Sequence, residues 1–145
     1  MKKTNIVKRI SFVALFSALT SILYCYVRFP LPIFPSFLDI NVSMIPVIIC
    51  AFMLGPWDAM MCVVIRFAIK LLLVPTGTAY VGEIADLILG LVPAVSAGLI
   101  YHYYKGKHKE LLAFTSVVVL WGITGVLLNI YVNIPVYLNM FLREI

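Results

Sequence analysis

The sequence predicts an all-α membrane protein built as a helical bundle of five transmembrane helices. Hydrophobic residues make up 63% of the 145-residue chain and charged residues only 12%, and the mean hydropathy is +1.09. Soluble domains average about 45–50% apolar and about 25% charged residues. Long uncharged runs also recur between clusters of proline, glycine or lysine. A spanning helix needs about 20 apolar residues, so one domain over residues 1–145 has room for five or six.

The boundaries of the five helices follow from charge and from helix-breaking residues. The first run follows Lys8 and Arg9, and Gly55-Pro56 separates the second from the third. A Pro-Thr-Gly-Thr turn and the KGKHK loop delimit the fourth, and Pro135 is expected to end or kink the fifth. The helices are therefore predicted at residues 10–27, 41–55, 57–74, 80–103 and 111–134.

The basic residues predict the orientation of the chain. Lysine and arginine cluster at the N-terminus and in the KGKHK loop at 105–109, as is typical of cytoplasmic segments. We therefore expect a multi-pass protein of the cell membrane with a cytoplasmic N-terminus. The net charge of +5 is explained by this pattern, so no nucleic-acid partner is predicted. The first apolar run lacks a signal-peptide cleavage site and is interpreted as a retained helix.

Residues 28–39 form an apolar segment that cannot be helical throughout, because it contains Pro30, Pro32 and Pro35. Non-helical backbone at membrane depth must pack on protein or line a water-filled cavity. One interpretation is an irregular outer loop that caps the bundle, with Phe34 and Phe37 directed to its interior. The other is an interfacial loop that holds its aromatic side chains at the headgroup level.

Two helices carry ionisable residues within their apolar runs. Arg66 and Lys70 are four residues apart, and Glu83 and Asp86 are three apart, so each pair shares a helix face. Such groups usually pair or line a cavity. We expect the cations to pair with the anions, and Glu83 in particular with Arg66 or Lys70. The cluster is either a structural ion-pair group or a polar wall of an outward-facing solute pocket.

The fifth predicted helix carries Asn129 and Asn133. An amide donates and accepts hydrogen bonds, so it can recognise the polar edge of a heterocycle. Its structural alternative is an interhelical hydrogen bond, worth about 0.6 kcal/mol in membranes. No phosphate-binding loop, zinc-protease motif, nucleophile elbow or metal-ligand spacing is present, and the three cysteines read as small buried hydrophobes. No catalytic residues, metal or cofactor are therefore predicted.

Several segments together resemble a known family. PLPIFPSFL, a helix ending in LGP, TGTAYVGEIADLILG, and NIYVNIPVY after the KGKHK loop are similar to segments of the S components, the substrate-binding subunits, of energy-coupling factor (ECF) vitamin transporters. The likeness runs from about Lys8 to Tyr137 and is greatest to the riboflavin-specific group. The chain departs from the family at Asp86, where an asparagine is common, and it lacks the sixth helix, so it is expected to be C-terminally short.

The resemblance implies a six-helix fold, a vitamin pocket that opens outward, and energy from a transmembrane coupling subunit with two ATPase subunits. Ala14 and Ala18, a small-xxx-small pattern, match the motif by which the first helix docks to the coupling subunit. The ligand is expected to be riboflavin. Tyr80 and Tyr131 can offer stacking surface beside the two phenylalanines. The expected ligand-binding residues are Phe34, Phe37, Leu38, Tyr80, Glu83, Asp86, Asn129 and Asn133.

Other functions stay open on the sequence alone. The chain can be an S component for another vitamin or a modified base, or a membrane interaction protein that binds no ligand. A membrane enzyme is the third alternative, although Glu83 and Asp86 lack a partner nucleophile or metal set.

Overall fold

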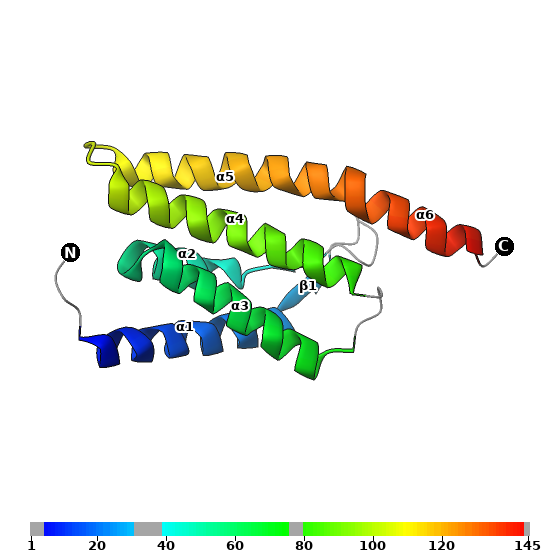
Figure 1. The fold of residues 1–145 in the computed structure, drawn as a ribbon, viewed down its shortest axis with the longest axis horizontal. Helices are drawn as coiled ribbons and strands as arrows, with labels where there is room; N and C mark the ends of the chain where they lie inside the picture. Colours follow the sequence, from blue (N-terminus) through cyan, green and yellow to red (C-terminus); the bar gives the residue numbers. More distant parts are fainter. Residues whose placement is uncertain (1–4, 31–38, 76–79, 144–145) are drawn as a thin grey trace.

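A computed structural model describes residues 5–30, 39–75 and 80–143. Nearly all of this chain is helical, with one short two-stranded sheet near the end of the first helix (Figure 1). The elements in chain order are α1 (Ile6–Tyr26), β1 (Arg28–Pro30), β2 (Asp39–Asn41), α2 (Met44–Leu54), α3 (Pro56–Leu73), α4 (Val81–Tyr103), α5 (Lys109–Leu128), the π-helical segment η1 (Asn129–Asn133) and α6 (Ile134–Arg143).

The five predicted helices are all present, but one expectation was wrong in detail. The segment 28–39 is not irregular throughout, because its two ends pair as antiparallel strands with Phe29 opposite Ile40. Because β2 extends to Asn41, the second helix begins at Met44 and not at residue 41.

Of the two alternatives for Pro135, ending or kinking the fifth helix, the structure excludes the first, because the helix continues into η1 and α6. The backbone changes to π geometry before it, where the N–H of Ile134 bonds to the carbonyl of Asn129. Pro135 then falls in the first turn of α6, where a missing N–H is tolerated. As a result α5, η1 and α6 form one continuous rod that extends beyond the other helices (Figure 1).

Three helices in the described part of the chain are long and apolar enough to cross a membrane: Ile6–Tyr26, Gly82–Tyr103 and Lys109–Val136. The two others are built differently. Helix α2 has 11 residues, about 16 Å at 1.5 Å per residue, which is shorter than the hydrocarbon layer. Helix α3 carries three charged residues. These two helices form a hairpin around Gly55, which has a positive φ of 111°.

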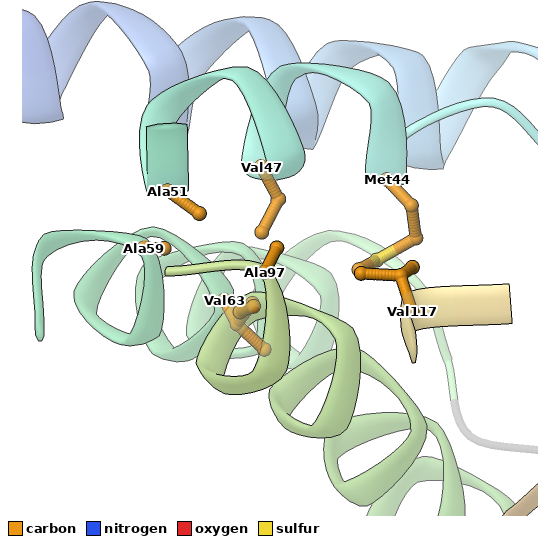
Figure 2. Close-up of a cluster of buried hydrophobic side chains, with 8 residues drawn as sticks. Met44, Val47, Ala51, Ala59, Val63, Ala97 and Val117 are labelled. Carbon is orange, nitrogen blue, oxygen red and sulfur yellow. The ribbon is translucent and has the colours of Figure 1, made fainter. Parts of the chain in front are cut away.

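Helix α3 lies at the centre of the bundle and contacts α1, α2 and α4, whereas α5 packs mainly on α4. The core between them uses small side chains (Figure 2), which let helices approach closely in lipid. Gly98 of α4 is an extreme case, since a Cβ there would lie 2.6 Å from the backbone of Pro56. The buried core consists of Met44, Val47, Ala51, Ala59, Val63, Ala94, Ala97 and Val117.

The two ends of the bundle are built from different helix ends and loops (Figure 1). One end holds the start of α1, the turn between α2 and α3, and the basic loop between α4 and α5. The opposite end gathers the end of α1, the strands, the start of α2, the end of α3, the start of α4 and η1. Polar residues from several separate helices therefore come together at this second end, which we call the polar end.

Candidate ligand-binding site

Arg66 is the centre of the polar end. Its side chain is only 2% exposed, although it carries a permanent charge. One terminal nitrogen donates to Ser43 Oγ at 3.0 Å and lies 3.3 Å from Met44 Sδ, both at the start of α2. The other donates to Asp86 Oδ2 of α4 at 3.4 Å. Arg66 therefore joins three helices through one guanidinium group.

Tyr24 at the end of α1 completes this group. Its ring centroid lies 4.7 Å from Arg66 Cζ and 4.9 Å from Lys70 Nζ. Both cations are within the distance at which an aromatic ring attracts a positive charge. Lys70 Nζ also lies 4.0 Å from Asp86 Oδ2, so the carboxylate is near both cations. We refer to Tyr24, Ser43, Arg66, Lys70 and Asp86 as the Arg66 cluster.

Gly90 makes room for the guanidinium between α3 and α4. A Cβ at this position would lie 2.8 Å from Arg66 Nη2 and 2.9 Å from Val63 Cγ1. A larger residue would have to push the guanidinium or the helix away. The absence of a side chain at Gly90 thus allows α4 to pass close to α3 one turn from Asp86.

The predicted pairing of α3 cations with α4 anions is confirmed, with Asp86 as the partner of both cations. Glu83 is buried at 7% exposure, and its pairing with Arg66 or Lys70 stays a prediction. The interpretation as a structural ion-pair group fits Arg66, and the interpretation as a polar pocket wall fits Asp86. Arg66 is enclosed and joins helices, whereas the Asp86 side chain is 30% exposed. Its long contacts to the two cations leave Asp86 capacity to accept further hydrogen bonds.

The other predicted site residues are distributed as follows. Tyr80 precedes α4 with a φ of 67° and is 60% exposed; such strained conformations cluster at functional sites. Asn129 begins η1 and is exposed. Asn133 ends η1, but its side chain lies outside the described residues, as do Phe34, Phe37 and Leu38.

Asn129 lies one helical turn after Gly125, a position at which α5 approaches α4. A Cβ at Gly125, one turn earlier, would lie 3.7 Å from Leu89 Cδ2. Because α4 and α5 run antiparallel (Figure 1), the turn after Gly125 lies level with the turn before Leu89. These turns contain Asn129 and Asp86. Segment η1 also contacts α4, and π-helical turns are frequent at functional sites.

A separate hollow of about 530 Å³ lies on α6. Its volume falls within the range of small-molecule sites. Among the described residues it is lined by Val136, Asn139, Leu142 and Arg143, and so by none of Tyr80, Glu83, Asp86 or Asn129. Its described lining comes from α6 alone, whereas the Arg66 cluster combines side chains from several helices. We therefore place the candidate site at the cluster.

Comparison with known proteins identifies the family. The model for the family described as ECF transporter, substrate-specific component, matches residues 8–145. The chain belongs to this family of S components. A solved S component of a bacterial ECF transporter has the same fold, with a TM-score of 0.78 and 22% sequence identity over 92% of this chain and 77% of that chain. A comparison with curated proteins gave no significant match.

Family membership fixes the general role. The S component is the substrate-binding subunit of an ECF transporter, a multi-pass membrane protein and not an enzyme, and its general partners are a substrate and an ECF module. The expected family is thus confirmed from independent comparisons.

Sequence analysis missed three contributors to the S component's polar end. Tyr24 and Ser43 were not predicted, because a tyrosine and a serine at helix ends carry no periodic signal. Gly90 lies in the run ILGLVP, and its closeness to Arg66 depends on how α3 and α4 pack. The sequence feature that could have indicated Gly90 is its position one helical turn after Asp86, an acidic residue within an apolar helix.

Helix α1 of the S component has two different faces. Ser17, Thr20 and Ser21 are buried, with exposures of 2%, 0% and 5%. They face the inside of this chain. Ala14 and Ala18 are exposed, so within the described residues these alanines are not used for packing inside the bundle. The exposed alanines leave a surface on which another helix can approach closely.

Proposed function

We propose that this S component captures riboflavin or a closely related flavin at its polar end, for uptake driven by the ATPase subunits of an ECF module. The observation that supports the proposal most is the contact of α4, which carries the partly exposed carboxylate of Asp86, with the π-helical segment that begins at Asn129. The likeness of the sequence to riboflavin-specific S components adds to it.

The chemistry of this end suits a flat, polar-edged ligand. A pocket for such a molecule is mostly apolar with a few placed polar groups. The amide of Asn129 can donate to and accept from the ring edge, and Asp86 and Glu83 can accept from hydroxyl groups. Tyr80, three residues before Glu83 in the chain, offers an exposed ring. The remaining walls are proposed to come from Phe34, Phe37, Leu38 and Asn133.

The distribution of basic residues supports an outward-facing site. Exposed Lys8, Lys105 and Lys107 all lie at the end opposite the Arg66 cluster. Under the positive-inside rule that end is cytoplasmic. The polar end would then face outward, with the N-terminus inside, as the sequence predicts.

Docking to the coupling subunit is proposed for the Ala14 and Ala18 face of α1. Both residues are exposed; Ala14 lies in the half of α1 nearer the basic end, and Ala18 lies just past the middle of the helix. A partner helix can reach them without crossing the polar end. Ligand binding and docking would thus use separate surfaces of the same small bundle.

Riboflavin titration of the purified protein tests the proposed ligand. We expect a protein purified from riboflavin-supplied cells to be yellow, and riboflavin to quench the fluorescence of Trp57 and Trp121 in a saturable, stoichiometric manner. Biotin, thiamine and folate, titrated in parallel by calorimetry, serve as controls. A colourless protein that shows no quenching and gives no heat with riboflavin would reject the flavin. Binding of another vitamin would then reassign the ligand, and binding of none would favour an interaction protein.

A further inference from the structure

Cys50 and Cys62 form a buried thiol pair between α2 and α3. Their sulfur atoms are 3.5 Å apart, and both residues are 0% exposed. The sequence alone predicts small buried hydrophobes at these positions. They lie equally far on either side of Pro56, so the turn of the helical hairpin brings them level with each other. Cys25, the third cysteine, is half-buried on α1.

The pair lies on the same interface as the Arg66 cluster. Cys62 precedes Arg66 by one helical turn, and Cys50 follows Ser43 by two turns, so each pair shares a helix face. The Arg66–Ser43 hydrogen bond at 3.0 Å and the sulfur contact are thus two polar links along one α2–α3 seam. A bond between the sulfurs would hold α2 and α3 together along the interface that contains the Arg66–Ser43 hydrogen bond.

We propose that Cys50 and Cys62 are a peroxide-sensitive site that forms a disulfide and clamps α2 to α3. The sulfurs are already in contact, and a disulfide requires about 2 Å between them. The complete burial of the pair favours a small uncharged oxidant such as hydrogen peroxide over a bulky disulfide.

The chemistry balances with peroxide as the oxidant. One sulfur attacks a peroxide oxygen; an S–O bond forms, the O–O bond breaks, and the first water leaves with the thiol proton. The second sulfur then attacks the sulfenic sulfur; an S–S bond forms, the S–O bond breaks, and the second thiol proton leaves with the hydroxyl group as water. The two thiols lose two electrons and peroxide is reduced to two waters.

The first test is chemical and uses the full chain in detergent. In a Cys25→Ser background, peroxide treatment followed by denaturation and alkylation should leave no free thiol. Peptide mapping should find the Cys50 and Cys62 peptides linked, and dithiothreitol should release them. Cys50→Ala in the same background is the matched control, and its Cys62 should give no internal link. In the wild-type protein, loss of the free Cys25 thiol shows that the oxidant is active.

The second test measures whether the disulfide between Cys50 and Cys62 raises the melting temperature. Closing a loop restricts the unfolded chain, so oxidation should raise the melting temperature of the Cys25→Ser protein, with reversal by dithiothreitol and no rise in the Cys50→Ala control. The proposal is overturned if both thiols stay alkylatable at a peroxide concentration that consumes Cys25. Sulfinic acid without a link, or a linked protein with an unchanged melting temperature, also overturns it.

Discussion

Removing the charge of Asp86 should destabilise the bundle while keeping its shape. Asp86→Asn preserves the size of the side chain but leaves Arg66 and Lys70 without the carboxylate that lies 3.4 Å and 4.0 Å from them. Both cations also face the ring of Tyr24. The variant therefore leaves two like charges close together, one of them almost fully buried.

The size of this effect follows from burial. Breaking a buried ion pair by removing one partner costs about 3–5 kcal/mol, whereas exposed pairs are worth about 0–1 kcal/mol. Arg66 is 2% exposed but Asp86 is 30% exposed, and their contact is long. We therefore expect a loss of about 1–3 kcal/mol, between the two limits. At about 2–4 °C for each kcal/mol, the melting temperature should fall by several degrees.

A thermal-unfolding series in detergent checks this expectation. Glu110→Gln is the matched control, because it removes an exposed carboxylate and should change little. Lys70→Met combined with Asp86→Asn should cost less than the sum of the two single changes, since the Lys70–Asp86 contact is lost only once and no second cation remains beside Arg66. Strictly additive losses, or an Asp86→Asn protein as stable as wild type, would refute the coupling.

Three further changes address the remaining surfaces. Asn129→Leu should weaken riboflavin binding about tenfold to hundredfold by leaving a polar edge unpaired, whereas Thr115→Val, on the same rod but at the other end, should not; equal affinities in the titration would remove Asn129 from the site. Ala14→Trp with Ala18→Trp should keep riboflavin binding in detergent and abolish ATP-driven uptake after reconstitution; loss of binding or normal uptake would contradict docking. Gly90→Ala should lower the free energy of unfolding by about 1–3 kcal/mol through crowding of Arg66, which thermal unfolding would reveal as a lower melting temperature.

Helix positions were predictable because apolar length and helix-breaking residues act locally. Gly55-Pro56 fixed the α2–α3 boundary to one residue. The continuation past Pro135 was not predictable in the same way, because a π turn is a change in hydrogen-bond register that leaves no clear sequence pattern. The strand pairing of Phe29 with Ile40 joins residues separated by a proline-rich segment, which local propensity does not specify.

The candidate site was predictable in its charges but not in its geometry. Charged residues in apolar helices are costly, so Arg66 and Asp86 were visible as partners. Which carboxylate serves the cations depends on helix rotation, and the structure selects Asp86 for the contacts described. The contributions of Tyr24 and Gly90 depend on the approach of α1 and α4 to α3, which are properties of packing.

Helix α1 contributes both to the bundle interior next to the proposed ligand site and to the surface proposed for docking. Two of its buried hydroxyls can face inward because they bond along their own helix: Ser17 Oγ donates to the Val13 carbonyl at 2.6 Å, and Ser21 Oγ donates to the Ser17 carbonyl at 2.7 Å. Small, self-bonded side chains allow close packing on α3 without needing a partner there.

The same helix is fixed to α3 at both ends. Near the basic end, Arg9 Nε donates to Asp58 Oδ2 at 2.6 Å, and at the polar end Tyr24 lies over the cations of α3. The outward alanines thus lie on a helix whose inner face is attached to the helix that carries Arg66. Helix α3 thus contacts both the helix that carries the face proposed for docking and the end proposed for ligand binding.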